Sequence, residues 1–191
     1  MHDGQKHGKG IFILEKSHNI FLYEATIDRN IPTIQRLIIG EENKEWRQFI
    51  GQFDASFKPV KAMMISSEGN SYEGQFEKMI PSGQGKQINS QGDILEGAFS
   101  DGRMTGICQY KNGDVYEGPV DQFEEQNTRH GKGKMTYKES GISWEGVWSN
   151  DLRHGQGRET YADGSYCIGE WRYDKPLEKF TQFDANGNQL E

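Results

Sequence analysis

Trp144-Glu145-Gly146-Val147-Trp148, followed by His154-Gly155-Gln156-Gly157, is the stretch of sequence that decides the fold. The same phrase recurs as Tyr72-Glu73-Gly74-Gln75-Phe76 and, in part, as Tyr116-Glu117-Gly118. Its first residue, the anchor of each copy, falls at Phe49, Tyr72, Leu95, Tyr116, Trp144, Cys167 and Leu190, with spacings of 23, 23, 21, 28, 23 and 23 residues. A fixed period of about 20–50 residues is the signature of a repeat architecture. We therefore expect a tandem array rather than an ordinary globular domain.

The pattern inside each copy predicts a β-hairpin. Alternate side chains of a strand lie on opposite faces, so Trp144, Gly146 and Trp148 share one face. The glycine leaves room for a ring from the adjacent strand to lie against bare backbone. A second strand follows the Gly-x-Gly segment, and pairs such as Asn112-Gly113 and Asp163-Gly164 favour tight hairpin turns at its end. Successive hairpins are expected to continue as a meander.

The succession of Tyr-x-Gly-x-Trp, His-Gly-x-Gly and Asp-Gly resembles the MORN-repeat family over nearly the whole chain, most closely from Tyr72 to Trp171. The resemblance implies an all-β fold, an elongated, single-layer, twisted antiparallel sheet used mainly for protein–protein contacts. We expect one array over residues 1–191, composed of a partial repeat at 1–22, a degenerate repeat at 23–48 and repeats at 49–71, 72–94, 95–115, 116–143, 144–166 and 167–189.

The chain opens in the middle of a repeat. Asp3-Gly4 and His7-Gly8-Lys9-Gly10 match the turn, but the strand that precedes this turn in the other copies is missing. An unpaired sheet edge is a template for another strand. We expect a self-capped terminus, a truncated chain, or an edge at the N- or C-terminal end that pairs with a partner or a second copy.

Two further stretches depart from the pattern. Residues 20–48 have lost the glycines, but their alternating apolar residues favour two strands joined by a turn at Arg29–Pro32. A helix over Thr33–Ile39 is the alternative. The copy at Tyr116 contains Pro119, which cannot donate to a strand ladder, and an insertion at Gln122–Thr128. There we expect a kink with a protruding acidic loop, or else a tolerated surface insertion.

Composition narrows the class of protein. The chain has 24 glycines and only 33% hydrophobic residues, but its 10 Phe, 8 Tyr and 4 Trp are too many for a disordered chain. A net charge of −7 disfavours nucleic acid and anionic bilayers as principal partners. Cys108 and Cys167 form no metal or redox spacing, and no apolar run or signal peptide is present. We expect a soluble intracellular protein.

The residues that invite a chemical interpretation do not support one. His7, His130 and His154 occupy the same repeat position, so neighbouring copies would stand about 10 Å apart, too far to share a zinc ion bound at about 2 Å. The His-Gly-x-Gly segments precede a strand and not the helix that a phosphate loop requires. No catalytic triad stands out. We expect no catalysis, no metal and no cofactor.

The candidate site is a surface of aromatic side chains. We expect contact with a partner through Phe53, Tyr72, Phe76, Phe99, Tyr116, Tyr137, Trp144, Trp148, Tyr161 and Trp171. About half to two-thirds of the rings are expected mainly to hold the sheet by packing on glycines. The structural glycines are Gly51, Gly74, Gly97, Gly118, Gly146 and Gly169. On the opposite face we expect a solvated acidic stripe made of Glu24, Glu73, Glu96, Glu117 and Glu145.

The function expected from these features is a non-catalytic scaffold that grips a helix or an extended segment of another protein. The family resemblance suggests a cytoskeletal assembly, with the ciliary axoneme as the favoured setting. One alternative is a membrane-surface adaptor that binds anionic phospholipids. Another is a regulatory repeat subunit of an enzyme complex. Trp148→Ala and Phe76→Ala are expected to weaken partner binding if these rings face the groove.

Overall fold

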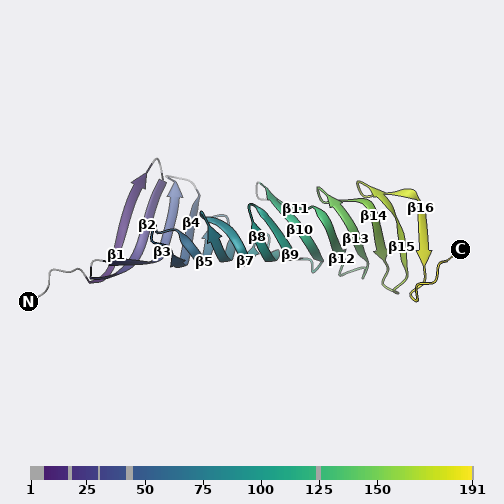
Figure 1. Ribbon diagram of the computed structural model, residues 1–191, viewed down its shortest axis with the longest axis horizontal. Coiled ribbons are helices and arrows are strands. Elements are labelled where there is room, and N and C mark those ends of the chain that lie inside the picture. The colour runs from purple at the N-terminus through teal and green to yellow at the C-terminus, as the bar shows by residue number, and fades with distance from the viewer. Residues whose placement is uncertain (1–6, 17–18, 30, 42–44, 124–125, 191) are drawn as a thin grey trace, which may run out of the picture. The chain divides into compact units, whose positions relative to one another are not determined.

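The computed structural model describes residues 7–16, 19–29, 31–41, 45–123 and 126–190 (Figure 1). Within these ranges the regular elements are β-strands. The chain divides into two compact units, Met1–Ser90 and Gln91–Glu191. In each unit the strands form an open antiparallel arrangement in hairpin order, so the expected all-β fold is confirmed. The described residues contain no helix with the length and apolar character that a membrane crossing requires.

Unit 1 is a meander in which each strand pairs with the next one. Residues 20–48 form the predicted two strands, and Thr33–Ile39 lies in the second of them rather than in a helix. The β-branched residues of this stretch favour the extended backbone. The strands are β1 (Gly8–Lys16), β2 (Asn19–Asp28), β3 (Ile31–Glu41), β4 (Trp46–Phe53), β5 (Pro59–Ser66), β6 (Ser71–Glu77) and β7 (Ile80–Ile88).

Unit 2 continues the same hairpin pattern. Its strands are β8 (Ile94–Ser100), β9 (Arg103–Gln109), β10 (Val115–Phe123), β11 (Gln126–Arg129), β12 (Gly131–Thr136), β13 (Ser143–Ser149), β14 (Leu152–Thr160), β15 (Tyr166–Arg172) and β16 (Lys175–Phe183). Most pair with their sequence neighbours, but β10 has two partners along its second edge. Its first residues pair with β12 and its last ones with the short β11.

The insertion in the Tyr116 copy is built into this double pairing. Val120–Phe123 pairs with Gln126–Arg129, so the stretch predicted as a protruding loop is largely strand, and that prediction is wrong for its described part. Glu124 and Glu125 lie outside the described residues. Pro119 lies inside β10, and the pairing with β9 runs without a register shift past it. The described part of the insertion thus lengthens one hairpin of the sheet.

The rings cover glycine pairs that face each other across a hairpin. Gly146 and Gly157 are register partners, and a Cβ added to either would meet the Trp144 ring. Tyr72 and Tyr116 cover the corresponding glycines of their own hairpins. The prediction that glycines make room for rings is therefore confirmed. The first glycine of these pairs is covered by the anchor two residues earlier on its own strand, and the second by the same ring reaching across from the adjacent strand. At Gly169 the ring is that of Phe180 on the adjacent strand β16, as predicted.

Neighbouring turns are joined by side-chain hydrogen bonds. In each case an Asn or Asp near one turn accepts a hydrogen bond from a backbone N–H of the next turn. The bonds run from Ser90 N to Asn70 Oδ1, from Lys111 N to Asp93 Oδ1 and from Lys138 N to Asp114 Oδ1, each at 2.9 Å. These bonds satisfy backbone donors of the turns that the strand ladder does not use. Each hairpin thus positions the turn of its neighbour.

Candidate interaction surface

The structure places most of the predicted partner-binding rings in the core. Seven of them are at most 7% exposed: Tyr72, Phe76, Phe99, Tyr116, Trp144, Trp148 and Trp171. Phe53 and Tyr137 are half-buried, and Tyr161 is 38% exposed. The share of rings that hold the sheet is therefore larger than expected. Only these last three offer surface to a partner in this conformation.

In unit 2 four buried rings and the half-buried Phe180 form one edge-to-face series, which we call the ring spine. Its centroid distances are 5.6 Å from Tyr116 to Trp148, 4.9 Å from Trp148 to Trp144, 5.6 Å from Trp144 to Trp171 and 4.8 Å from Trp171 to Phe180. The interplanar angles lie between 81° and 87°. Edge-to-face pairs add about 0.5–1.5 kcal/mol to the burial of each ring. The spine is therefore a stabilising element and not a binding surface.

The anchor tyrosines are fixed at both ends. The Tyr116 hydroxyl donates to the Pro119 carbonyl at 3.2 Å, and the Tyr72 hydroxyl donates to the Gln75 carbonyl at 3.0 Å. Burial raises the pKa of both phenols. The two side chains stay neutral and hold the chain just beyond each repeat glycine.

The predicted structural glycines lie where no larger residue fits. A Cβ on any of them would lie less than 3.0 Å from another atom. At Gly146 that atom is Cη2 of Trp144, at 2.5 Å, whereas in the copy at Leu95 the glycine pair Gly97 and Gly106 meets backbone directly. The repeat glycine thus allows either a ring or a neighbouring strand to approach closely.

Two arginines each bind an aspartate of the next repeat, and we call these two contacts the arginine clamps. They were not predicted from the sequence. Arg129 donates from its backbone N and from Nε to Asp151 Oδ1, both at 2.8 Å, and its guanidinium lies 4.2 Å from the Trp148 ring centroid. Arg153 makes the same pair of bonds to Asp174, at 2.9 and 3.0 Å. The available signal was an arginine directly before His-Gly in both copies. These clamps link successive repeats of unit 2.

The described histidines contact separate partners. His7 Nδ1 lies 3.0 Å from Asp28 Oδ1, and the His154 ring packs against Tyr173 at 5.0 Å between centroids. Among the described residues no group of three or more His, Cys, Asp or Glu side chains is arranged to hold a metal ion. His7 and His154 therefore contact neighbouring side chains of the sheet.

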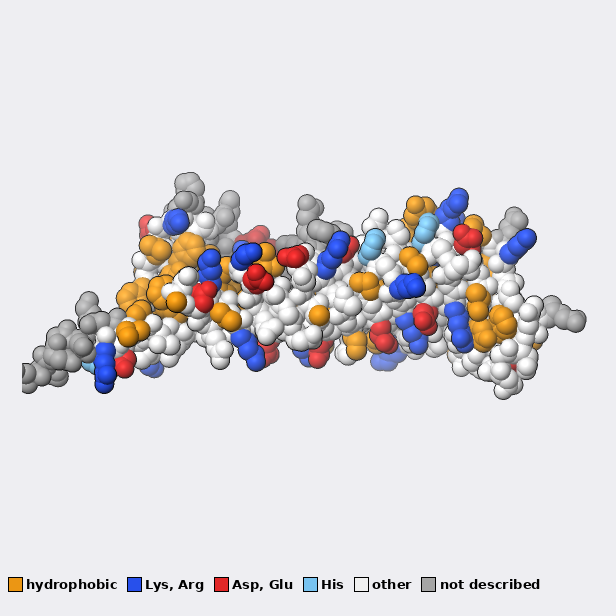
Figure 2. Space-filling model, in the orientation of Figure 1, with side chains coloured by type: hydrophobic (Ala, Val, Ile, Leu, Met, Phe, Trp, Pro, Cys, Tyr) orange, Lys and Arg blue, Asp and Glu red, His pale blue; other side chains and the backbone are white. Residues whose placement is uncertain are grey.

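The face opposite the rings, the outer face, is apolar in unit 1. Strand register places Ile11, Glu24, Arg36, Ile50 and Met63 in one row across β1–β5. Neighbouring rows add Ile13, Ile20 and Trp46. We call the exposed apolar members the outer patch, which consists of Ile11, Ile13, Ile20, Trp46, Ile50 and Met63, each 40–65% exposed. Figure 2 shows hydrophobic side chains gathered over the N-terminal strands of unit 1.

One ion pair lies within the outer patch. Arg36 Nη1 lies 3.4 Å from Glu24 Oε1, and its Nη2 donates to Gln48 Oε1 at 2.6 Å. The charges of this row are thereby matched to each other, so the patch is close to neutral. Exposed apolar side chains that gather on one face are a common feature of interaction sites, so this patch is the candidate surface.

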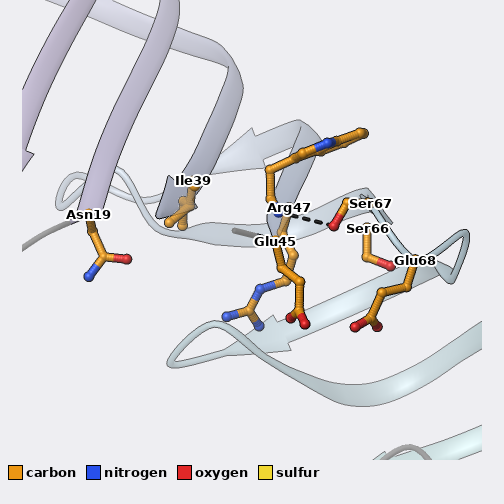
Figure 3. Close-up of a pocket in the computed structure, with 9 residues that line it drawn as sticks. Asn19, Ile39, Glu45, Arg47, Ser66, Ser67 and Glu68 are labelled. Carbon is orange, nitrogen blue, oxygen red and sulfur yellow. Dashed lines mark hydrogen bonds between the residues drawn. The ribbon is translucent and has the colours of Figure 1, made fainter. Parts of the chain in front are cut away.

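A recess of about 550 Å³ adjoins the patch where β3 and β4 meet the turn after β5 (Figure 3). Trp46 lines it, and its backbone N–H donates to Ser67 Oγ at 3.1 Å. The Glu45, Arg47 and Glu68 side chains point to the same side of these strands. Because Arg47 follows Trp46 directly on β4, its side chain lies on the opposite face of the strand, so these charged groups stand on the ring side of the sheet and not on the outer patch.

The outer face of unit 2 is charged instead. Glu117, Lys134, Glu145 and Arg158 succeed one another across β10, β12, β13 and β14. They border a groove of about 570 Å³ that also includes Val147 and Ile168. The predicted acidic residues Glu73, Glu96, Glu117 and Glu145 are exposed, and Glu24 is half-buried. Cross-strand Lys134 and Arg158 interrupt the stripe in unit 2, so it is not uniformly acidic.

Comparison with known proteins gives one positive result. A family model described as MORN repeat matches residues 1–16, 72–94, 96–115, 125–141 and 144–166, more than half of the chain. It leaves out residues 17–71, where the glycines are sparse, and the stretch from 167 onward. No curated protein matches the chain.

Proposed function

The chain belongs to the MORN-repeat family, and from that membership we propose that it is a non-catalytic scaffold that binds another protein through the outer patch of unit 1. Repeats of this family are often involved in protein or membrane binding, and the family is generally non-catalytic. The observation that carries the proposal is the outer patch itself. Six exposed apolar side chains share one face of neighbouring strands, while the rings of the opposite face are used to hold the sheet.

The chemistry of the patch defines its partner. The patch carries aliphatic and thioether groups at Ile50 and Met63, and the ion pair between Glu24 and Arg36 leaves no uncompensated charge in the row that they share. Trp46, 42% exposed, stands at one end of the patch, and the exposed Lys9 and Glu15 of β1 lie on the same outer face. An amphipathic segment of another protein, with an apolar face and polar flanks, complements this surface.

The net charge favours a protein over a membrane. Anionic bilayers attract clusters of Lys and Arg. Here the chain carries a net charge of −7, and the arginine in the patch is paired with Glu24. An anionic phospholipid surface therefore lacks the attraction it would need.

Site-specific cross-linking tests the proposal. A photo-reactive residue at Ile50 should capture a partner segment with an apolar face, and the same residue at Ile168 should not. Ile168 is the matched control, because it is 40% exposed on the charged outer face of unit 2. Ile50→Glu should abolish capture at a second patch position such as Met63, whereas Ile168→Glu should leave it unchanged.

Three outcomes would reject the proposal. The first is capture at Ile168 but not at Ile50. The second is flotation of the chain with phosphatidylcholine vesicles that contain a phosphoinositide, at physiological salt, which would favour the membrane adaptor. The third is capture of one catalytic subunit through unit 2 alone, which would favour a regulatory role in an enzyme complex.

The proposal extends to a cytoskeletal assembly, with the ciliary axoneme as the favoured setting. This extension is supported by family analogy and by no residue of the chain. Fractionation of ciliated cells provides the measurement: the chain should remain with detergent-extracted axonemes. Complete release into the detergent-soluble fraction would remove this setting while leaving the outer patch proposal intact.

A further inference from the structure

We propose that β1 pairs antiparallel with β1 of a second copy of this chain, in the register that sets Phe12 opposite Phe12. The interface is the strand edge of β1; it shares Ile11 and Ile13 with the outer patch, but the inference does not rest on the function proposed above. Among the described residues β1 is paired with β2 only. The inference follows from the composition of β1, its charges and its symmetry.

β1 lacks the features that normally protect a sheet edge. Natural edge strands carry central Lys, Pro or inward charges that prevent pairing with another chain. The centre of β1 is Ile11-Phe12-Ile13-Leu14, and these four side chains are 63, 44, 65 and 54% exposed in order. Both faces of the strand are therefore apolar at its middle. The edge of such a strand favours pairing with another strand.

The last strand of unit 2 provides the contrast. β16 contains Lys175, Pro176 and Lys179, which are common protective residues on edge strands. The segment after it also folds back, because Leu190 N donates to Gln182 O at 2.8 Å. The last strand of unit 2 is thus protected by its own residues and by the segment after it, whereas the described residues give β1 no such protection.

The charges of β1 select its partner and its register. Antiparallel pairing about Phe12 sets Lys9 opposite Glu15 twice, once on each side of the two-fold axis, and sets Ile11 opposite Ile13. Lys9 and Glu15 are both exposed and both lie on the outer face. A shift of two residues would place Lys9 opposite Ile13 or Glu15 opposite Ile11. Parallel pairing in register would bring Lys9 against Lys9. The strand is therefore complementary to itself in one register.

The same register keeps equivalent faces together. Directly opposed residues of antiparallel strands point to the same side of the sheet. With Phe12 opposite Phe12, the two-fold axis stands perpendicular to the sheet, and both ring faces lie on one side. The outer faces of the two copies then become continuous.

Cysteine cross-linking reads this register directly. Opposed residues of antiparallel strands have Cα atoms about 4.5–5.5 Å apart, within disulfide range. Phe12→Cys should therefore give an oxidised dimer of twice the 21.8 kDa chain mass. Leu14→Cys is the matched control, because it lies on the same face but about 14 Å from its counterpart, four residues along the strand. The native Cys108 and Cys167 are buried and do not interfere.

Charge reversal tests the same contact without a covalent bond. Glu15→Lys creates two like-charge pairs and should weaken the dimer about tenfold or more in sedimentation equilibrium. Lys9→Glu combined with Glu15→Lys should restore it. Glu139→Lys, an equal charge change in an exposed turn, should have no effect.

Three results would overturn the inference. They are a monomer at every concentration up to the millimolar range, equal cross-linking of Phe12→Cys and Leu14→Cys, and failure of the double charge swap to restore what Glu15→Lys removes. Loss of the patch-dependent capture at Ile50, by contrast, would leave the β1 pairing unaffected. The two proposals therefore fail separately.

Discussion

Replacing Trp144 with alanine should lower the free energy of unfolding of unit 2 by about 4–5 kcal/mol. The side chain is 0% exposed. A buried aromatic ring removes about 150–250 Å² from water, and at about 25 cal/mol per Å² this gives about 4–6 kcal/mol. Measured losses for Trp→Ala in cores are about 3–5 kcal/mol. The upper end applies, because the ring covers Gly146 and Gly157, which have no side chains to fill the space.

The ring contacts of Trp144 also predict a large loss of stability. Its ring makes edge-to-face contacts with Trp148 at 4.9 Å and with Trp171 at 5.6 Å, and both are lost together. Trp144→Phe should cost less than the alanine change. Trp144 Nε1 is buried and has no hydrogen-bond partner among the described residues, so the phenylalanine variant sacrifices no hydrogen bond there.

Urea unfolding followed by far-UV circular dichroism measures the loss without relying on the fluorescence of the deleted ring. Trp46→Ala is the matched control, since Trp46 is 42% exposed and its removal should cost less than about 1 kcal/mol. A cost below about 1 kcal/mol for Trp144→Ala, or equal costs for the two variants, would refute the assignment of Trp144 to the core.

Two further substitutions and one labelling experiment also test the structure. Gly133→Ala places a methyl group against the Tyr116 ring and should lower the free energy of unfolding by about 2–4 kcal/mol in urea melts. Gly10→Ala, in the matching repeat position with no atom nearer than 3.6 Å, should cost about 1 kcal/mol or less, and equal costs would contradict the packing. Arg129→Ala removes a clamp arginine that is only 18% exposed and should cost about 2–3 kcal/mol, against less than about 1 for Arg103→Ala, whose side chain is 69% exposed; the reverse order in urea melts would contradict the clamp. Burial raises the pKa of the Cys108 thiol to about 12, so it stays protonated in the folded state and should resist alkylation at pH 8 until urea unfolds the chain; rapid labelling of the native protein, read by mass spectrometry, would show that the site is open.

The sequence was sufficient to predict the hairpins because their signals are local. Alternation around Gly146 and turn pairs such as Asp163-Gly164 determine the strand boundaries without distant information. The two strands at residues 20–48 could be predicted for the same reason, even without glycines. Register within each hairpin follows from the side on which the rings lie.

The burial of the rings could not be predicted in the same way. Alternation shows that Trp144 and Trp148 share a face, but not that they pack edge to face on a glycine pair and leave no exposed surface. The buried rings therefore offer no surface for the predicted partner contact in this conformation, which is why the proposed contact is at the outer patch. Trp148→Ala and Phe76→Ala, expected to weaken binding, should instead destabilise the fold, because these rings are 1% and 7% exposed.

The clamps and the outer patch could not be predicted from the sequence for a different reason. Arg129 and Asp151 are 22 residues apart and meet only because β-strands of successive repeats bring them together. The patch arises from register across β1–β5, so it joins Ile11 to Met63 although no local pattern connects them. Long-range pairing of this kind is not a property of any single segment.

The ring spine also has an optical consequence. Trp144, Trp148 and Trp171 stand 4.9 and 5.6 Å apart at steep angles, close enough for their indole transitions to couple. Such coupling should give a bisignate circular dichroism band near the indole absorption and depolarise tryptophan emission by transfer between rings. Trp46 is the one tryptophan of unit 1 and contributes no such pair within that unit. The chain therefore carries an internal chromophore array that reports on unit 2 alone.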